Sequence, residues 1–520
     1  MAPPPDSHVL AIDAGTQSVR AILFDRDGTP VARAQVALTP PFESPEPGWA
    51  EQDPFAYWNA LRTSVAQLWA EGADPARVVA LVMTTQRGTV ICTAADGTPL
   101  RPAIVWPDQR LATALPALGL GWTTAFRVAG AYDLVRNLQR QAEVNWLAEH
   151  DPTWARTERV TLLSGWLTHR LVGDWVDSSA CQVGYLPLDY RTQQWANAGS
   201  WRWKALAVRA AQLPRLVAPA ERLGSLTDDA ANALGLPVGL PVIAAAADKA
   251  CEVLGCGALE PTTAHCSFGT AATINTTQAR YVEVLRLLPA YPAAMPGAFN
   301  TEIQIERGFW LVSWFRREFG AAEVARAAAL GTSAEALFDE LIDAVPPGAM
   351  GLMLQPFWSP GVRDPGPEAK GAIIGFGGIH TRAHLYRALI EGIAYGLRAG
   401  RERIERKLGH PLTRLVISGG GSQSDGAMQV TADVFNLAAE RPAVYEASAL
   451  GAAMLGAAGA GIHPGVPEAV RAMAHPGRRF EPQPTHARTY DALYREVYRP
   501  LYARLAPLYR RIRAITGYPA

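Results

Sequence analysis

The sequence predicts an α/β protein built from at least two domains. The chain is 520 residues long, and a single domain usually takes about 100–200 residues. Hydrophobic residues make up 49% of the chain and charged residues 18%, so large buried cores are feasible and disorder is disfavoured. Short apolar strand patterns alternate with helical patterns, and one strand–turn–strand pattern occurs in both halves.

The charge balance argues against a nucleic-acid-binding protein. Lys and Arg together number 48, Asp and Glu also number 48, and the formal net charge is therefore +0. A nucleic-acid interface would require a basic excess or a basic stripe. We therefore expect no nucleic-acid partner.

The cysteines and the hydrophobic pattern favour a reduced, cytoplasmic protein. An odd number of cysteines at scattered spacings does not indicate a disulfide framework. Cys251, Cys256 and Cys266 cluster, but no CxxC pair or paired histidines accompany them, so a zinc site is disfavoured. The N-terminus lacks the basic region of a signal peptide, and the most apolar stretch, Ala447 to Ile462, is shorter than the ~20 residues of a membrane span. We therefore expect no membrane association.

The N-terminal residues predict three strands in a meander. Val9 to Ile12 is a short apolar run that ends at Asp13, and a polar turn separates it from a second run, Val19 to Phe24. Asp27-Gly28 is a turn signal, and residues 31–36 alternate as in a strand. A dinucleotide-binding βαβ unit would require a helix after the first glycine turn, where the pattern predicts a strand. A Rossmann-type oxidoreductase is therefore disfavoured.

Helical and strand patterns continue through the rest of the first half. Apolar spacing predicts helices over residues 54–73, 142–149 and 162–171. Short apolar runs predict strands over residues 78–83, 90–93 and 240–245.

The strand–turn–strand pattern begins again after residue 255. Ala264 to Phe268 and Ala271 to Asn275 are strand-like and flank a tight Gly269-Thr270 loop, which we interpret as a second copy of the first hairpin. A strand is predicted over residues 415–418, and helices over residues 380–407, 425–435, 447–459 and 490–512. Pro500 and Pro507 are expected to kink or split the last helix. Its tyrosines, at helical spacing, predict a packing face, with a contact to a second copy of the chain as the alternative.

The first motif that carries chemistry runs from Asp13 to Ser18, between the first two predicted strands. The turn at Gly15 presents backbone N–H groups, and the hydroxyls of Thr16 and Ser18 add donors that can bind phosphate oxygens. Asp13, at a strand end, could hold Mg²⁺ through water, since Mg²⁺ binds few carboxylates and keeps much of its hydration. The alternative is an ordinary hairpin with a polar turn.

Two further glycine loops follow apolar strands. Phe268-Gly269-Thr270 repeats the glycine turn between two strands, and the two turns suggest two phosphate-binding hairpins that face each other across a cleft. Gly419-Gly420-Gly421 allows the backbone to approach a ligand closely. It is not a dinucleotide fingerprint, because Ser424 stands where GxGxxG requires glycine, and the chain contains no Walker-A Gly-Lys-[Ser/Thr]. The alternative is a glycine-rich turn without a ligand.

A single carboxylate, Asp248, follows the apolar strand pattern that begins at Pro241. A strand that delivers one carboxylate to its end is a common way to place a general base. The positive charge of Lys249 could keep Asp248 ionised despite partial burial. The alternative is a helix N-cap aspartate.

These four motifs, in this order, resemble the FGGY family of carbohydrate kinases, and the resemblance covers nearly the whole chain. Further segments of the family type occupy residues 47–54, 85–89, 103–110, 387–394, 429–434 and 447–453. The resemblance implies an α/β architecture of two actin-like (ribonuclease-H-like) domains that flank a deep catalytic cleft. Residues 1–254 would bind the sugar and residues 255–520 would bind ATP.

The resemblance also implies the reaction and the residues that carry it. The γ-phosphoryl group of ATP, bound with Mg²⁺, would move to a hydroxyl of a small sugar, and Asp248 would accept the hydroxyl proton. Asp13 would lie beside the metal. The implied phosphate and ATP contacts are Gly15, Thr16, Ser18, Gly269, Thr270, Gly420, Gly421 and Ser424. The implied sugar contacts are Arg87, Trp106, Asp108 and Lys249. Alignment and charge neutralisation, which these groups supply, are what phosphoryl transfer requires of a protein.

The substrate pocket matches neither well-known pattern of the family. Glycerol kinases carry Gln-Arg-Glu-Thr where this chain has Gln86-Arg87-Gly88-Thr89, and xylulose kinases usually carry Gln-Met-His-Gly. Arg363-Asp364-Pro365 keeps part of the family's Gly-Glu-Arg-x-Pro pattern, with Val362 in place of Glu. Glycine in place of glutamate leaves more room, so we expect a sugar larger than glycerol, a ketopentose such as xylulose. Glycerol or another polyol is the alternative substrate.

A non-catalytic sugar or nucleotide sensor on the same scaffold is a competing class. Loss of Asp13, Asp248 or the Gly-Thr loop would favour a sensor, and all three are present. The expected partners are therefore a small-molecule sugar and, as a candidate homodimer, a second copy of the chain.

Overall fold

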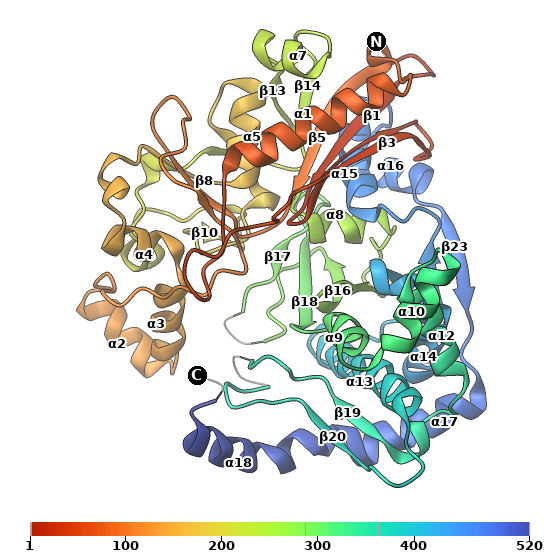
Figure 1. Cartoon of the computed structure of the whole chain (residues 1–520). Coiled ribbons are helices and arrows are strands. Elements are labelled where there is room, and N and C mark those ends of the chain that lie inside the picture. The colour runs from red at the N-terminus through yellow and green to blue at the C-terminus, as the bar shows by residue number, and fades with distance from the viewer. Residues whose placement is uncertain (1–2, 286–287, 362–364, 519–520) are drawn as a thin grey trace. The chain divides into compact units, whose positions relative to one another are not determined.

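The structure is a computed structural model that describes residues 3–285, 288–361 and 365–518 (Figure 1). Contacts divide the chain into two compact units, and each is described by itself. The first unit comprises Met1–Gly257, Gln278–Asn300 and Glu446–Ala474, and the second comprises Ala258–Thr277, Thr301–Tyr445 and His475–Ala520. The sequence predicts a single division between residues 254 and 255. The first change of unit lies close to it, and two later segments cluster with the first unit.

A six-stranded sheet with the order β13-β14-β5-β1-β2-β3 forms the centre of the first unit. Its strands are β1 (His8–Ala14), β2 (Ser18–Phe24), β3 (Pro30–Ala37), β5 (Val78–Thr85), β13 (Arg222–Ser225) and β14 (Pro241–Ala244). β1 pairs antiparallel with β2 and parallel with β5, and β2 pairs antiparallel with β3. The predicted meander is therefore confirmed, and no helix follows the first glycine turn.

The inner strand β1 is buried on both faces, which explains its continuous apolar run. Leu10 and Ile12 belong to the core that includes helix α1 (Pro54–Ala70), and α1 packs on β2 and β3 (Figure 1). Helix α15 (Ala447–Gly459) packs on β1 and β5. The other helices of this part are α5 (Leu163–Val172), α7 (Asp228–Leu234), α8 (Asp248–Gly255) and α16 (Val466–Met473).

Helices α8 and α15 approach each other closely, and glycine makes this possible. A Cβ added to Gly451 would lie 1.9 Å from the carbonyl oxygen of Cys251, and a Cβ on Gly255 would lie 2.0 Å from that of Ala447. The Ala- and Gly-rich sequence of α15 is thus the signature of a buried, tightly packed helix, as the sequence predicts.

A second, smaller core of the first unit surrounds a four-stranded sheet with the order β4-β7-β6-β8. Its elements are β4 (Glu51–Gln52), β6 (Val90–Thr93), β7 (Ala103–Ile104), β8 (Arg159–Leu162), α2 (Leu120–Val128), α3 (Tyr132–Gln141), α4 (Glu143–His150) and α6 (Arg202–Ala205). Two short strand pairs complete the unit: β9 (Val176–Ser178) with β12 (Arg215–Val217), and β10 (Leu188–Asp189) with β11 (Gln194–Trp195). Trp146 and Trp166 are buried, as expected for tryptophans that pack rather than bind sugar.

A seven-stranded sheet with the order β17-β18-β16-β15-β21-β22-β23 forms the centre of the second half. Its strands are β15 (Thr263–Phe268), β16 (Ala272–Gln278), β17 (Tyr291–Pro292), β18 (Phe299–Ile305), β21 (Arg414–Ser418), β22 (Ala439–Pro442) and β23 (Pro476–Phe480). β15 pairs antiparallel with β16 and parallel with β21, which repeats the arrangement of β1, β2 and β5. The predicted second copy of the hairpin is therefore confirmed.

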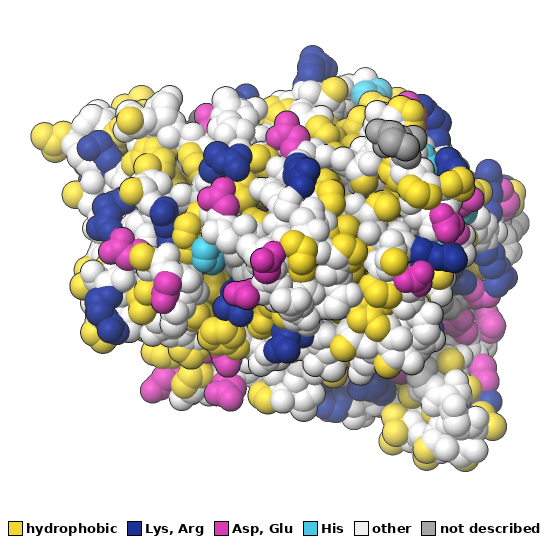
Figure 2. Space-filling model, turned by 90° about the horizontal axis from the view of Figure 1, so that it is seen from above, with side chains coloured by type: hydrophobic (Ala, Val, Ile, Leu, Met, Phe, Trp, Pro, Cys, Tyr) yellow, Lys and Arg dark blue, Asp and Glu magenta, His cyan; other side chains and the backbone are white. Residues whose placement is uncertain are grey.

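The helices of the second unit include one of 27 residues, α13 (Arg382–Leu408). The others are α9 (Trp310–Phe319), α10 (Ala321–Leu330), α11 (Ala334–Leu337), α12 (Asp339–Asp343), α14 (Asp425–Phe435), α17 (Pro484–Leu493) and α18 (Arg499–Thr516), and β19 (Met353–Gln355) pairs with β20 (Ala372–Ile374). Within the described ranges, no helix is long and apolar enough to cross a membrane. On the face shown in Figure 2, acidic and basic side chains are interspersed.

The C-terminal helical pattern is interrupted at its first proline. Pro500 has no N–H to donate to the preceding turn, and residues Tyr494–Tyr498 form a π-helical turn between α17 and α18. Pro507 lies inside α18. The rings of Tyr494 and Tyr498 pack against Tyr395 of α13, with centroids 6.0 and 5.1 Å away. This part of the tyrosine stripe is therefore an internal packing face, as the sequence predicts.

Candidate active site

Asp13 lies at the end of β1, opposite Arg20 on β2. Arg20 Nη1 donates to Asp13 Oδ2 at 3.1 Å. Burial raises the pKa of Asp13 to about 6, because the raising effect of burial and of the nearby Asp248 charge exceeds the lowering effect of Arg20. The two carboxylates predicted to act together are therefore close enough to repel each other electrostatically.

Asp248 is the first residue of α8, directly after β14. The N-cap of α8 is Ala247, and no side chain caps it, so the alternative of an N-cap aspartate is wrong. Asp248 Oδ1 accepts a hydrogen bond from its neighbour's backbone, Lys249 N, at 2.7 Å. Burial raises the pKa of Asp248, and the charges of Lys249 and Arg87 oppose this rise. A carboxylate with this balance can stay ionised and still have a higher proton affinity than an exposed aspartate.

The ammonium of Lys249 has a carboxylate partner of its own. Lys249 Nζ lies 2.8 Å from Glu252 Oε2, one turn along α8. Burial alone would lower the pKa of Lys249, but Glu252 and Asp248 hold it above its ordinary value. Lys249 is therefore a permanent positive charge beside Asp248, whereas its predicted contact with the sugar stays a prediction.

In the turn between β1 and β2, the side-chain hydroxyls are hydrogen-bonded within the protein. Gly15 N donates to Ser18 O at 3.0 Å and closes the turn. Thr16 Oγ1 donates to Gln86 Oε1 at 2.6 Å and accepts from Trp106 Nε1 at 2.8 Å. Ser18 Oγ accepts from Gln35 Nε2 at 3.0 Å. The two hydroxyls predicted to bind phosphate thus have partners within the protein, because each already lies between neighbouring side chains.

The backbone of the same turn supplies the free donors. Among the residues that the structure describes, the N–H groups of Thr16 and Gln17 have no hydrogen-bond partner. Consecutive free N–H groups in a turn form a concave site for anions. Phosphate binding by this turn stays a prediction, and its backbone N–H groups are the donors available for it.

Two predicted sugar contacts, Arg87 and Trp106, lie on either side of Gly88 in the sequence of the first unit, and Gly88 lies against Trp106. The guanidinium of Arg87 lies over the ring of Tyr291, 5.4 Å from its centroid. Gly88 has a φ of +64°, in the left-handed region that favours glycine, and a Cβ there would lie 3.5 Å from Trp106 Cβ. The indole of Trp106 is 52% exposed although its Nε1 is bonded to Thr16. An exposed indole held by a hydrogen bond suits the apolar face of a sugar, and a guanidinium can donate to the sugar's hydroxyls.

Asp108, by contrast, has no oxygen left for a substrate. Its carboxylate accepts from Ala50 N, Arg110 N, Arg110 Nε and Arg110 Nη2 at 2.7–2.9 Å. The guanidinium of Arg110 lies between the rings of Trp49 and Trp146, 4.0 and 4.6 Å from their centroids. The geometry therefore corrects the prediction of a direct sugar contact: Asp108 anchors the loop that carries Trp106.

Sequence reasoning missed three residues of this cluster. Gln86 Nε2 donates to Tyr57 OH at 2.8 Å, so a chain of hydrogen bonds runs from Trp106 through Thr16 and Gln86 to Tyr57. Gln86 stands in a segment of the family type, which could have indicated it. Tyr57 lies inside a helical pattern, and no sequence signal distinguishes Tyr291.

The carbonyl groups of the Gly-Thr loop in the second unit lie against the start of a helix. Gly269 O accepts from Phe309 N at 3.1 Å, and Thr270 O accepts from Trp310 N at 3.2 Å, at the start of α9. Within the described part of the chain, the N–H groups of Gly269 and Thr270 have no partner. The two hairpins therefore share one property, a turn with two free backbone donors.

The triple-glycine loop packs against the same helix start. A Cβ on Gly419 would lie 2.9 Å from the backbone of Phe268, and one on Gly421 would lie 2.3 Å from Phe309 Cδ1. Gly420 has more room, since its Cβ would come no closer than 3.8 Å to another residue. Ser424 is the N-cap of α14 and accepts from Ala427 N at 2.9 Å. Close packing thus explains Gly419 and Gly421, and Gly420 borders open space.

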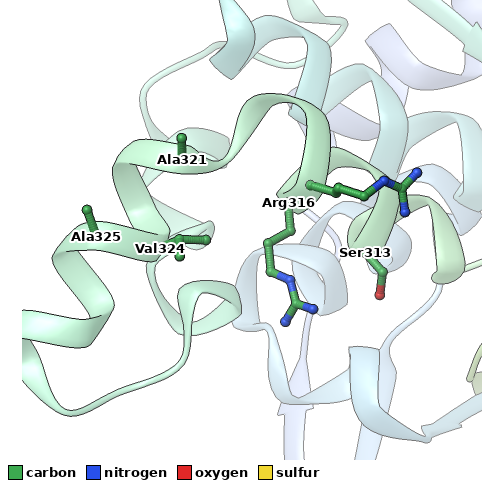
Figure 3. Close-up of a pocket in the computed structure, with 6 residues that line it drawn as sticks. Ser313, Arg316, Ala321, Val324 and Ala325 are labelled. Atoms are coloured by element: carbon green, nitrogen blue, oxygen red, sulfur yellow. The ribbon is translucent and has the colours of Figure 1, made fainter.

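A cavity of about 510 Å³ lies beside α9 and α10 (Figure 3). It is lined by Ser313, Arg316, Arg317, Ala321, Val324 and Ala325. Both arginines have carboxylate partners: Arg316 bonds Glu335 at 2.8 Å, and Arg317 bonds Glu318 at 2.7 Å. The Val324 side chain points toward the Arg316 side of the cavity (Figure 3). An apolar wall with a guanidinium rim can accept a flat, polar-edged group.

The described residues contain no metal site formed by side chains alone. No group of three or more His, Cys, Asp and Glu side chains could hold an ion there, and the five cysteines are buried thiols that form no disulfide. Asp13 and Asp248 fit a different kind of site, because Mg²⁺ binds through one or two carboxylates, water and substrate phosphates. Val362, Arg363 and Asp364, which carry part of the predicted family pattern, lie outside the described residues.

Comparisons with known proteins agree on one family. The models of the FGGY family of carbohydrate kinases match residues 8–255 (N-terminal domain) and 264–460 (C-terminal domain). The uncharacterized sugar kinase YgcE of Escherichia coli (strain K12) is 30% identical over 513 residues, 95% of this chain and 93% of that protein. A glycerol kinase of Dechloromonas aromatica (strain RCB) is 32% identical over 495 residues, 92% and 93% of the two chains. The crystal structure of xylulose kinase from Rhodospirillum rubrum has a TM-score of 0.81 at 27% identity and covers 97% of this chain and 100% of its own.

Proposed function

The chain belongs to the FGGY family of carbohydrate kinases, and we propose that it transfers the γ-phosphoryl group of ATP to a hydroxyl of a ketopentose such as xylulose. The family makes the chain a carbohydrate kinase, a phosphotransferase with an alcohol group as acceptor. The observation that carries the proposal is the position of Asp248, a buried carboxylate at the start of α8 in the same unit as Arg87 and Trp106.

Asp248 is the proposed general base. Its raised pKa increases its affinity for the hydroxyl proton, and the nearby charges of Lys249 and Arg87 keep it ionised. A positioned base contributes roughly 10²–10⁴-fold to a rate. Lys249, paired with Glu252, would act on the charge of Asp248.

The free N–H groups of the two hairpin turns are the proposed phosphate contacts. Thr16 and Gln17 supply them in the first unit, and Gly269 and Thr270 supply them in the second. Asp13 and Asp248 would hold Mg²⁺ through water. Burial is the main cause of the raised pKa of Asp13, and the nearby charge of Asp248 adds to it, so a bound cation would stabilise the ionised form. When bound, Mg²⁺ neutralises charge on the transferring phosphoryl group. The cavity beside α9, a helix whose start is hydrogen-bonded to the Gly-Thr loop, is the proposed nucleoside site.

The proposed sugar contacts are Arg87 and Trp106, with Gly88 leaving room between them. Arg87 would donate to sugar hydroxyls, and the exposed face of Trp106 would cover the carbon chain. Glycerol or another polyol is the second candidate, since a glycerol kinase is among the relatives at 32% identity. The missing carboxylate at Gly88 favours the larger sugar.

A panel assay tests this proposal. Release of ADP would be followed with ATP, Mg²⁺ and, in turn, xylulose, ribulose, glycerol and erythritol. The proposal predicts sugar-dependent ADP release, highest with a ketopentose. Preference for glycerol would overturn the proposed substrate, and absence of any sugar-dependent turnover would favour the non-catalytic sensor.

A further inference from the structure

We propose that Asp177 is a positioning residue for phosphoryl transfer. It anchors the strap, residues 177–184, which fixes both the backbone before Asp248 and the turn at Gly88. The inference rests on the proposed role of Asp248 as the base. Asp177 itself touches no residue assigned to sugar or nucleotide, so it would act through the strap.

One end of the strap holds the backbone that leads into Asp248. Ser178 Oγ donates to Ala245 O, and Ala247 N donates to Ala180 O at 3.1 Å. The residue between them, Ala246, accepts at its carbonyl oxygen from Thr84 Oγ1 of β5 at 2.8 Å. The three residues before Asp248 are therefore each fixed by a hydrogen bond, two of them from the strap.

The other end of the strap holds the predicted sugar-binding turn. Gly88 N donates to Val183 O at 3.1 Å. Gly88 follows Arg87 and lies against Trp106, so its position sets the space between these two side chains. The strap also packs against β17, which carries Tyr291 below the Arg87 guanidinium. One short segment thus bonds the backbone just before the proposed base and the backbone of Gly88, next to the proposed sugar contact Arg87.

Asp177 holds this segment with three hydrogen bonds. Its Oδ1 accepts from Ser178 N at 2.7 Å, and its Oδ2 accepts from Ser164 Oγ and from Gln182 Nε2, both at 2.6 Å. Gln182 Nε2 also donates to Ser178 O at 3.0 Å and so ties the far end of the strap to its beginning. The side chain is buried, with the residue 1% exposed. A carboxylate is needed here because all three partners donate to it.

Substitution by asparagine would break this arrangement without removing bulk. An amide group offers one acceptor oxygen and one NH₂ donor. If the oxygen faces Ser164 and Gln182, the NH₂ group faces the N–H of Ser178, and the reverse orientation places it against the two side chains. At least one bond of the strap is therefore lost, and the bonds to Ala245 and Val183 lose their anchor.

The test compares Asp177→Asn with a matched buried control, Asn145→Ala. Asn145 also makes three hydrogen bonds, to Gln139 O, Ala205 O and Ala207 N, and none of these partners carries a proposed site residue. We expect Asp177→Asn to lower kcat about tenfold and to raise the sugar KM severalfold, since a misplacement of about 1 Å caused far from the reacting atoms can slow catalysis strongly. The KM for ATP should stay within about twofold. Asn145→Ala should lose thermal stability but keep kcat and both KM values.

A second measurement separates positioning from general damage. In an Asp248→Asn background the base is absent, so adding Asp177→Asn should change the residual kcat by less than about twofold, as expected for groups that act as a unit. A further tenfold loss would mean that Asp177 does not act through Asp248 and would overturn the inference. Wild-type kcat for Asp177→Asn alone would also overturn it.

The outcomes for the two proposals are distinct. If Asp248→Asn keeps wild-type turnover, the proposed base is wrong. If only Asp177→Asn keeps it, the base stands and the positioning role fails. Should Asp177→Asn not fold, Ser178→Ala decides, because it removes the hydroxyl that holds Ala245 O. It should lower kcat about threefold in the wild type and leave the Asp248→Asn residual rate unchanged.

Discussion

Glycine at position 88 is the most specific structural basis for a substrate larger than glycerol, and substitution by glutamate tests it. The backbone φ of Gly88 is +64°, where an L-residue costs roughly 1–2 kcal/mol. Space is adequate at the first atom, because a Cβ would lie 3.5 Å from Trp106 Cβ, an ordinary contact. Any side chain at this position therefore carries the same backbone penalty, and Gly88→Ala is the matched control for Gly88→Glu.

The expected change in substrate preference comes from a hydrogen bond between a polyol hydroxyl and the carboxylate that Gly88→Glu introduces. A polar group left unmatched in a binding site costs roughly 1–3 kcal/mol. At 1.4 kcal/mol per factor of ten, this corresponds to about one to two decades in specificity. We therefore expect the wild type to prefer a ketopentose over glycerol by at least about tenfold in kcat/KM. Gly88→Glu should move that ratio toward glycerol by at least about tenfold relative to Gly88→Ala.

The assay measures kcat/KM for xylulose, ribulose, glycerol and erythritol with all three proteins, by coupled detection of ADP. Comparison of the glutamate with the alanine variant removes the effect of the left-handed backbone. Two results would refute the reasoning: wild-type preference for glycerol, or the same substrate ratio for Gly88→Glu and Gly88→Ala. The kinase assignment would survive either result.

Three further predictions concern the Trp106 hydrogen bond, the packing of the triple-glycine loop and the pKa of Asp177. Trp106→Phe keeps an aromatic face but removes the bond to Thr16 Oγ1, so the sugar KM should rise severalfold while the ATP KM stays constant in steady-state kinetics. Gly421→Ala places a Cβ 2.3 Å from Phe309 Cδ1 and should raise the KM for ATP. Gly420→Ala is the control, because its Cβ would lie 3.8 Å from the nearest atom, and it should leave this KM unchanged. Equal effects of the two variants on the KM for ATP would contradict the packing argument. Burial raises the pKa of Asp177 to about 6, and its hydrogen-bond partners, Ser164, Gln182 and the Ser178 backbone, are all neutral. The stability that the protonated form of Asp177 contributes is therefore complete below the unfolded pKa, near 3.8, and is lost as pH rises through 6. In thermal unfolding, the free energy of unfolding of Asp177→Asn should fall further below that of the wild type at pH 5 than at pH 7.5.

Local periodicity predicts much of the fold. Helices over Asp425–Phe435 and Ala447–Gly459 have the bounds that the sequence predicts, because helical spacing and small residues mark them directly. The two hairpins are equally visible, since each is an apolar run, a glycine turn and a second run. These features depend on neighbours within a few residues, so the sequence displays them.

Long-range contacts account for what the sequence does not display. The Thr16 hydroxyl meets partners 70 and 90 residues away, Gln86 and Trp106, so its role as a phosphate contact could not be tested from the motif. Asp108 has the right chemistry for a sugar contact, but its oxygens are used by Arg110 and Ala50. The clustering of residues 278–300 with the first unit likewise depends on packing between distant segments.

The most direct test of the central proposal is the turnover of Asp248→Asn with its best sugar, measured beside its affinity for ATP. Asparagine has nearly the same shape but cannot accept the hydroxyl proton as a carboxylate does. The account predicts that kcat falls roughly 10²–10⁴-fold, while ATP binding by calorimetry and the thermal unfolding temperature stay close to wild type. A variant that retains half of the wild-type kcat would contradict the assignment of Asp248 as the base.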